Sequence, residues 1–470
     1  MDTSSVLGFV TIVFWLLCVV VAFSPLSWAV PAYLILAQMD VTPVGFEGGA
    51  EVGFANFVKI AVLPTVLYMR IRRGRSVENL RSLPFSGVWI AFICYVALAS
   101  LWTAFPLPAL KMLGFLYAYT LLFVIFADAW HSGTFNGSVI TAIAWISLIL
   151  AVIQSYVLGN AYGTPPGGSD YALQFTTFID AQSFAPFLLV LLVFQILYGA
   201  KRWSKLVICA CLIIAIVLAA SRYVLASTAM SFLIVYAGRA YIRHSRAGLR
   251  TLVKAVTVTA LLTVGLVWSV SRYFPTSRVN EALGAAISPA GSTDDVVNLA
   301  WRLQMYQEVQ QAVETRGVRE LFSGSGTSSG TVLRNNVVFA YDESTADANR
   351  VIHNEFLRAL YEWGILGCGL LVVFLGSVFT SCVVTFWRTR SIPALVCLSV
   401  FPLLVAGLGI ENVLSGSGRP NGVGFTLALA AFAASRVQGS ESRVPAPAQS
   451  KLLYRSSNPT VCGLPEGDMP

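Results

Sequence analysis

Long apolar runs recur along this chain, and they constrain its fold more than any other feature. Most are dominated by Leu, Val, Ala and Ile and approach the roughly 20 residues that an α-helix needs to cross a hydrocarbon core. They lack the strict alternation of a membrane β-barrel. Charged residues make up 11% of the chain, against roughly 25% in a soluble domain. The sequence therefore predicts an all-α, polytopic transmembrane bundle.

The apolar runs give about twelve or thirteen candidate spans. The count depends on the N-terminal region, where Pro25 and Pro31 could either break one long segment or separate two short ones. The first run has no basic n-region and no small-residue cleavage site, so we expect a retained span rather than a signal peptide. The candidate spans are Val6–Phe23, Trp28–Met39, Phe54–Met69, Phe85–Ala104, Leu107–Phe126, Val139–Leu158, Gln182–Tyr198, Leu206–Ala219, Tyr223–Gly238, Leu252–Val270, Tyr361–Phe386, Ile392–Gly409 and Val423–Ala434.

The positive charge of the chain lies in a few clusters, and each cluster adjoins an apolar run. This placement is typical of cytoplasmic loops under the positive-inside rule, and it favours contact with lipid headgroups. It argues against a nucleic-acid partner, despite the net charge of +8. The clusters are Arg70–Arg75, Lys201–Lys205, Arg239–Lys254 and Arg388–Arg390.

With the basic clusters in the cytoplasm, the polar stretch Tyr273–Ile352 must face the opposite side of the membrane. The sequence then divides into an N-terminal transmembrane bundle (1–272), a large and partly helical external loop (273–352), C-terminal transmembrane helices (353–436) and a tail (437–470). The tail is rich in Ser, Pro, Gln and Gly without apolar periodicity, which predicts a disordered cytoplasmic segment.

Within the large loop, two helices are expected. Ser292–Asp295 supplies capping residues, and apolar side chains then recur at three- and four-residue spacing as far as Val313. Such a helix could rest its apolar side on the bundle or on the membrane interface. The glycine-rich stretch Gly324–Gly330 breaks regular structure. A second helix is expected to start near Asn349 and to continue through His353 into the next span.

Two arginines stand out because both are predicted on the membrane side opposite the basic clusters. Arg222 lies in a turn between two apolar runs, where a cation needs an anionic partner or a watery cavity. Arg302 lies on the first loop helix, beside Trp301. A guanidinium suits bidentate binding of phosphate. The alternatives are ordinary: Arg222 could snorkel to headgroups, and Arg302 could be a solvated arginine on an amphipathic helix.

His353 is the histidine predicted on the same side, at or near the first turn of the helix that leaves the loop. The helix dipole disfavours an imidazolium there, so a neutral imidazole would remain available as a general base. A single histidine is, however, more often structural than catalytic.

Other chemistry has weaker support. The acid pairs Asp294–Asp295 and Asp342–Glu343 could hold a divalent metal, although adjacent acids in a loop are usually solvated or capping. The eight cysteines show neither a disulfide framework nor zinc-type spacing. The chain contains no P-loop, no GxSxG elbow and no HExxH.

Three short segments resemble the motifs of bacterial O-antigen ligases. His353-Asn354, nine residues and then Gly364-Ile-Leu-Gly367 match that family's His-[Asn/Ser/Gln]-x9-Gly-x-x-[Gly/Thr/Tyr] pattern without gaps. Ser221-Arg222 and the segment Ala300–Tyr306, which contains Arg302, resemble its two essential arginine positions. The large external loop followed by three spans also matches the family layout. An additional N-terminal span departs from the usual twelve.

The resemblance implies a GT-C-like glycosyltransferase of the bacterial inner membrane, whose active site faces the periplasm. Such enzymes move a polysaccharide from undecaprenyl diphosphate to lipid A–core, by an inverting transfer that needs neither a metal nor another cofactor. By this resemblance, Arg222 and Arg302 would bind the diphosphate. His353 would take the proton of the attacking sugar hydroxyl.

Three other readings remain open. An O-antigen polymerase shares this layout and donor, and a related ligase transfers glycans to protein. A rival of a different class is an envelope polysaccharide transporter. Charges in this chain lie toward the ends of spans rather than in their middles, which favours chemistry at the membrane surface over carriage through it.

Overall fold

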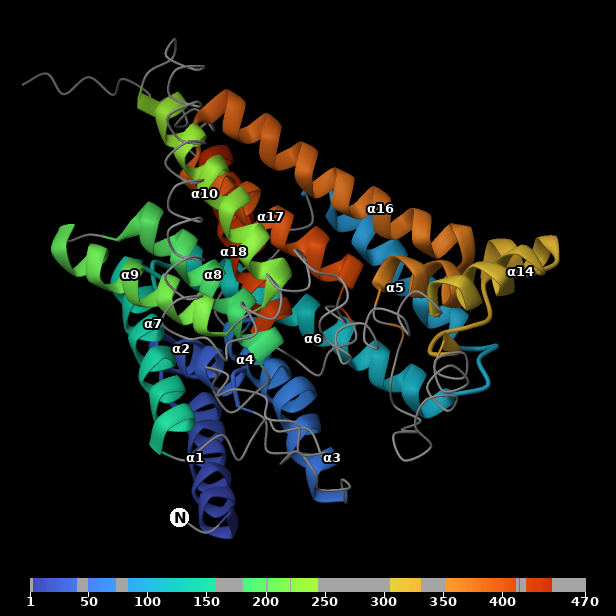
Figure 1. Cartoon of the computed structure of the whole chain (residues 1–470), viewed down its shortest axis with the longest axis horizontal. Helices are drawn as coiled ribbons and strands as arrows, with labels where there is room; N and C mark the ends of the chain where they lie inside the picture. Colours follow the sequence, from blue (N-terminus) through green and yellow to red (C-terminus); the bar gives the residue numbers. More distant parts are fainter. Residues whose placement is uncertain are drawn as a thin grey trace, which may run out of the picture.

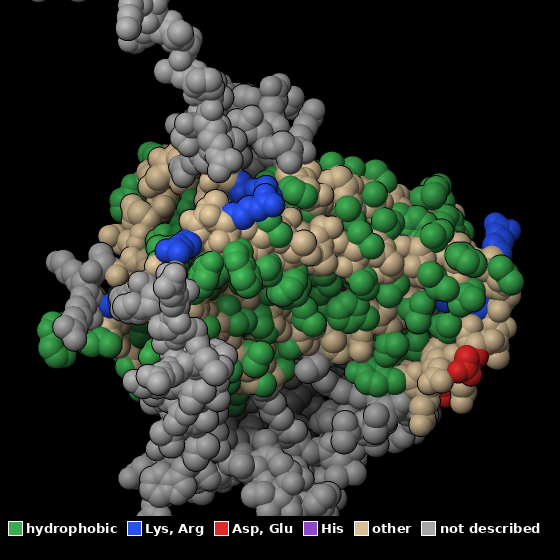
Figure 2. Space-filling model, turned by 90° about the horizontal axis from the view of Figure 1, so that it is seen from above, with side chains coloured by type: hydrophobic (Ala, Val, Ile, Leu, Met, Phe, Trp, Pro, Cys, Tyr) green, Lys and Arg blue, Asp and Glu red, His purple; other side chains and the backbone are tan. Residues whose placement is uncertain are grey.

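The computed structural model describes residues 3–39, 50–72, 83–157, 181–199, 202–219, 221–243, 305–330, 352, 354–410, 414 and 420–441. These residues form helices and connections without a strand (Figure 1). Six of the helices are long and apolar enough to cross a membrane, and shorter apolar helices accompany them. Hydrophobic side chains cover much of the face seen in Figure 2. The prediction of an all-α polytopic membrane protein is confirmed.

The N-terminal region forms two separate helices, α1 (Thr3–Phe23) and α2 (Leu26–Leu36), rather than one long span. Pro25 is the N-cap of α2, and Pro31 lies inside α2. Arg70, near the end of α4 (Leu63–Arg72), donates hydrogen bonds to the carbonyls of Val21 and Ala22 at 3.0 Å each. These carbonyls end α1, so a cation meets the negative end of a helix dipole.

The next span is one continuous helical rod with a π-helical insert. It consists of α3 (Ala50–Phe57), η1 (Val58–Val62) and α4. Lys59 of η1 is buried, and its ammonium donates to the Met39 carbonyl at 3.0 Å. The Tyr33 hydroxyl donates in turn to the Lys59 carbonyl at 3.1 Å. This polar contact ties the rod to the end of α2.

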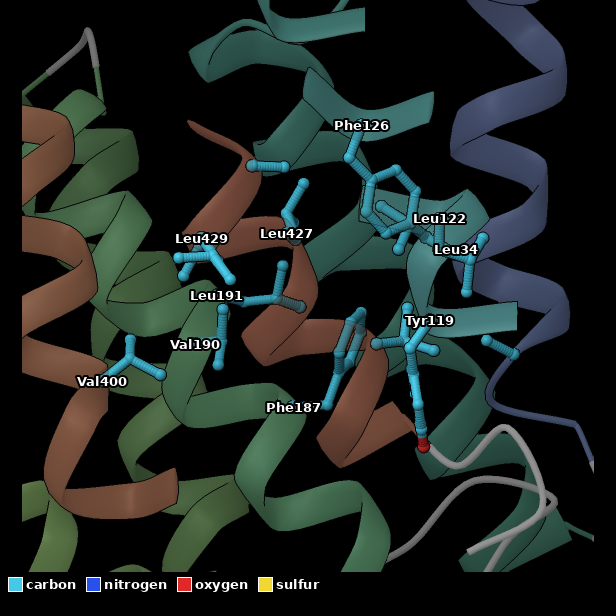
Figure 3. Packing of buried hydrophobic residues seen from close by; sticks show 14 of the residues in the cluster. Leu34, Tyr119, Leu122, Phe126, Phe187, Val190, Leu191, Val400, Leu427 and Leu429 are labelled. Atoms are coloured by element: carbon cyan, nitrogen blue, oxygen red, sulfur yellow. The ribbon is translucent and has the colours of Figure 1, made fainter. Parts of the chain in front are cut away.

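The apolar centre of the bundle is built by α6 (Pro106–His131), α8 (Ala181–Tyr198) and α18 (Pro420–Glu441). Figure 3 shows Leu427 of α18 among Leu122 and Phe126 of α6 and Leu191 of α8. All four side chains are buried. Small residues of α18 bring its neighbours close: a Cβ placed on Gly422 would lie 2.4 Å from the Tyr119 hydroxyl.

A second tight pair is formed by α10 (Arg222–Arg243) and α17 (Ile392–Ile410). A Cβ on Gly238 would lie 2.3 Å from Leu395 Cδ1, so this glycine permits the close approach of the two helices. The Ser231 hydroxyl donates to the Ser399 carbonyl at 2.5 Å. The remaining spans are α5 (Ser86–Ala99), α7 (Gly137–Val152) with η3 (Ile153–Val157), α9 (Arg202–Leu218) and α16 (Glu355–Thr389).

Basic residues from separate clusters meet at one end of the bundle. Lys205 and Arg239 both donate to the carbonyl of Ile196, near the end of α8. The Arg390 guanidinium lies 5.4 Å from the ring centroid of Tyr241 on α10. The sequence predicts that these basic clusters lie on one side of the membrane, and their position at one end of the bundle agrees with this. That this side is the cytoplasm remains a prediction.

Several sequence predictions fall on residues outside the described ranges. They concern the span Leu252–Val270, most of the large loop and the tail beyond Glu441. Helix α18 continues through Glu441 and therefore passes the expected boundary at 437. Within the loop, residues 305–314 are helical, as expected, and α14 (Val318–Ser323) adds a short helix that was not expected.

Candidate functional site

Of the three predicted site residues, Arg222 lies in a described helix. Arg222 is the first residue of α10, as expected for a residue that opens a span, but its side chain is outside the described set. Arg302 and His353 also lie outside the described residues. The convergence of the three side chains therefore remains a prediction. What the structure does describe is the framework immediately beside Arg302 and His353.

Helix α16 begins at Glu355, and Asn354 is its N-cap. The Asn354 side chain accepts hydrogen bonds from the amides of Phe356 and Leu357, at 3.0 Å each. The expected start near Asn349 is wrong, because Asn354 has an extended backbone and itself supplies the cap. In the sequence, His353 directly precedes this cap. The second motif position is thus a capping residue that fixes where the helix starts.

The loop helix at residues 305–314 packs on the beginning of α16. Met305, Val309 and Ile352 are fully buried against one another. Around this cluster pack Tyr306 and Val313 from the loop helix and Leu357 and Tyr361 from α16. Arg302 lies three residues before Met305, and His353 follows Ile352. The chain segments that carry these two predicted site residues therefore meet through an apolar contact.

A kink in α16 at Gly364 receives the glycine-rich loop. Gly364 has φ 62° and ψ −166°, and the bend leaves the preceding carbonyls of Tyr361 and Glu362 without their normal helical donors. Ser325 N donates to Tyr361 O at 3.1 Å, and Gly326 N donates to Glu362 O at 2.9 Å. The loop thus satisfies carbonyls that the kink exposes. The third motif position is this kink.

The approach of loop and kink needs glycine on both sides. A Cβ on Gly364 would lie 2.4 Å from the Phe322 carbonyl oxygen, and a Cβ on Gly324 would lie 2.3 Å from the Glu362 carbonyl oxygen. Gly324 also has a positive φ of 71°. A side chain at either position would force the two backbones apart.

The same loop reaches a third element, the C-terminal end of α5. Thr327 donates its amide to Ala99 O at 3.3 Å and its hydroxyl to Val96 O at 2.9 Å. The Trp363 indole donates to the Thr327 hydroxyl at 3.2 Å. In Figure 1, α14, the N-terminal part of α16 and the end of α5 lie side by side. The loop therefore joins two spans at the end of α16 opposite its basic terminus.

A buried charge cluster lies directly below the cap of α16, and the sequence analysis did not identify it. Glu355, Arg358 and Glu362 are each at most 1% exposed. Arg358 Nη2 lies 2.9 Å from Glu355 Oε2, and Arg358 Nε lies 3.8 Å from Glu362 Oε2. The signal was present, because three charges at i, i+3 and i+7 occupy one face of a helix that enters a membrane span. All three lie within the x9 segment of the motif.

Arg316 is a further cation of the loop that the sequence analysis left out. Its guanidinium lies 4.2 Å from the ring centroid of Tyr361, and its Nη2 donates to the Ser325 hydroxyl at 2.5 Å. It thus adds a polar clamp between the loop and α16. Among the described residues, no group of three or more His, Cys, Asp and Glu side chains could hold a metal ion. The predicted acid pairs lie outside those residues.

The described framework coincides with the part of the chain that matches a known family. A family model described as O-antigen ligase matches residues 207–372. This stretch runs from α9 through the large polar loop to the kinked part of α16, and it includes the positions of Arg222, Arg302 and His353. No curated protein matches the chain.

Proposed function

We propose that the chain is a member of the O-antigen ligase/polymerase superfamily, as the family match over residues 207–372 supports, and that it is a ligase that transfers a polysaccharide from undecaprenyl diphosphate to a sugar hydroxyl of lipid A–core. Members of the family are membrane glycosyltransferase-like enzymes. The family implies lipid-linked polysaccharide substrates and lipid acceptors. The particular donor and acceptor, the inner membrane and the periplasmic active site are parts of our proposal.

In the proposed reaction, the acceptor hydroxyl attacks the anomeric carbon of the donor sugar from the face opposite the diphosphate. A new glycosidic C–O bond forms, the bond to the diphosphate oxygen breaks, and undecaprenyl diphosphate leaves. His353 takes the hydroxyl proton as general base. Arg222 and Arg302 stabilise the negative charge that develops on the departing diphosphate. The donor is already activated, so the transfer needs no nucleotide.

The observation that best supports this proposal is the buried cluster of Met305, Val309 and Ile352. It joins the helix that follows Arg302 to the residue that precedes His353. The general base acts on the acceptor hydroxyl that forms the new bond, and the phosphate-binding groups act on the diphosphate whose bond to the same anomeric carbon breaks. The segments that carry them must therefore lie close together around one donor sugar. An apolar contact between the flanking residues provides this proximity.

The transporter alternative fits less well. Charges that the structure describes between the loop and α16 are buried in the cluster of Glu355, Arg358 and Glu362 or clamp the loop, as Arg316 does, while Glu314, Arg319 and Glu320 are exposed on the loop surface. Such an arrangement suits a fixed site at the membrane surface rather than a polar path through the bundle. Polymerase and protein-directed transfer share the proposed chemistry and differ in the acceptor.

The test is a gel of lipopolysaccharide from a deletion strain that is complemented with the wild-type chain or with His353→Ala. A ligase predicts that the deletion strain lacks O-chains on lipid A–core while long polymer accumulates on undecaprenyl diphosphate. Wild type should restore the ladder, and His353→Ala should not. Core molecules that carry a single repeat unit would instead indicate a polymerase. An unchanged ladder in the deletion strain would contradict both.

A further inference from the structure

We propose that Glu362 is a positioning residue. Its buried carboxylate fixes the loop segment 305–330 on α16, and it thereby holds Arg302 and His353 in their positions relative to each other. This inference rests on the proposed function. Glu362 would act through the loop segment that it binds. Nothing in the motif assigns a role to this position, because Glu362 lies within the unspecified x9 segment.

The geometry at Glu362 matches a carboxylate that receives two backbone amides. Ser328 N donates to Oε2 at 2.7 Å, and Gly330 N donates to Oε1 at 3.3 Å. A Cβ on Gly330 would lie 3.1 Å from Oε1, so a larger residue there would crowd the carboxylate. Ser328 has a positive φ of 67°, which is unfavourable for a non-glycine residue. The two hydrogen bonds thus hold a loop conformation that its own backbone does not favour.

Arg358 makes the burial of this carboxylate tolerable. Glu362 is 1% exposed, and an isolated buried carboxylate would be very costly. Arg358 lies between the two acids of the cluster and under Trp363, with its guanidinium 5.1 Å from the ring centroid. Glu355 in turn accepts a hydrogen bond from Leu414 N at 3.0 Å, in the connection between α17 and α18. The cluster therefore joins the loop to the C-terminal helices.

The loop segment that Glu362 holds is continuous with the helix at 305–314. The contacts at Ser328 and Gly330 secure its C-terminal end, and the apolar cluster at Met305 secures its N-terminal end. If the Glu362 contacts fail, the segment spends more time away from α16. The fraction of molecules with a complete diphosphate site then falls, and the apparent dissociation constant of the donor rises in inverse proportion to that fraction.

The decisive variant is Glu362→Gln. An amide has nearly the shape of the carboxylate, but it has one oxygen, so its NH₂ group must face either Ser328 N–H or Gly330 N–H. One hydrogen bond is then replaced by two opposed donors. We expect the KM for the lipid-linked donor to rise about tenfold, with a much smaller change in kcat, because saturating donor favours the docked loop. Hydrogen exchange of amides in 324–330 should accelerate by a similar factor.

The matched control is Glu320→Gln on the short helix α14. Glu320 belongs to the same loop segment and is exposed, so its replacement removes one acid from the loop surface and leaves the Glu362 carboxylate in place. It should leave both KM and exchange unchanged. Glu362→Asp retains the charge with a shorter reach, so its donor KM and its exchange rate at 324–330 should lie between those of wild type and Glu362→Gln. This variant tests the inference if the glutamine variant does not fold.

The two readouts separate this inference from the proposed function. Unchanged donor KM and unchanged exchange in Glu362→Gln and Glu362→Asp would overturn the positioning role. If the wild-type protein does not transfer polysaccharide at all, the proposed function fails, while exchange at 324–330 still reports whether Glu362 holds the loop. A drop in kcat at constant KM, without faster exchange, would also overturn it.

Discussion

At the residue scale, Asn354 and Gly364 show how motif positions without reactive groups shape the framework beside His353. Asn354, with its own extended backbone, caps the first amides of α16, and Gly364 bends the helix so that the loop can bond to its carbonyls. Both are geometric requirements, and their consequences for stability differ because one involves a hydrogen bond and the other involves steric exclusion.

Replacement of Gly364 should be costly. Gly364→Ala places a Cβ 2.4 Å from the Phe322 carbonyl oxygen in a backbone conformation that alanine rarely adopts. We expect the free energy of unfolding to fall by about 2 kcal/mol or more. The measurement is the midpoint of thermal unfolding in detergent, which should be lower than in wild type. Gly369→Ala is the matched control on the same helix, because nothing lies within 4 Å of its added Cβ. An equal effect of the two substitutions would contradict the role of the kink.

Replacement of the cap should have a smaller effect. Asn354→Ala removes the acceptor for Phe356 N and Leu357 N and should cost about 1 kcal/mol. Asn354→Ser keeps a side-chain oxygen at the cap and should restore most of that loss. Thermal unfolding of the two variants provides the comparison, and equal midpoints would show that the cap hydrogen bonds do not matter.

At the element scale, the helix at 305–314 is held on α16 by side chains that lie far apart in the chain. Its amphipathic spacing and the glycine-rich break after it could be predicted from sequence, because both are local patterns. The contact of Met305 and Val309 with Ile352 could not, because no local pattern specifies its partner. The start of α16 differs from the sequence prediction for a related reason: Asn349 and Asn354 are both possible caps, and the structure shows that Asn354 is the cap.

Docking of this helix can be tested at Val309. Val309→Ala removes two buried methyl groups from the cluster, a loss of about 1.5 kcal/mol at roughly 0.8 kcal/mol for each group. Hydrogen exchange at 305–314 should then become about tenfold faster. The control is Gln307→Ala, which alters an exposed side chain of the same helix. Equal exchange in the two variants would contradict docking through the apolar face.

At the scale of the whole molecule, the described spans follow the apolar runs closely, because burial in a bilayer demands long apolar helices. The buried cluster of Glu355, Arg358 and Glu362 did not follow from that rule, since its charges compensate one another inside the protein. The helices also place the loop and the basic cluster at opposite ends of α16. This arrangement predicts that the two ends face different compartments.

Cysteine labelling in intact cells tests that orientation. In a chain whose native cysteines are replaced by serine, Glu320→Cys should react with a maleimide that cannot cross the membrane in which the protein lies. Thr389→Cys, at the basic end of α16, should react only after the cells are opened. Both positions are exposed. Labelling of Thr389→Cys in intact cells, with protection of Glu320→Cys, would invert the proposed topology.

The most direct test of the account is transfer by the purified protein. The reaction would contain polysaccharide on undecaprenyl diphosphate as donor and lipid A–core as acceptor, with His353→Ala compared against His131→Ala, which alters a histidine at the far end of α6. We predict polysaccharide-bearing lipid A–core with wild type and with His131→Ala, and none with His353→Ala. Product formation by His353→Ala at the wild-type rate would contradict the proposed mechanism, and a wild-type protein without transfer would contradict the proposed function.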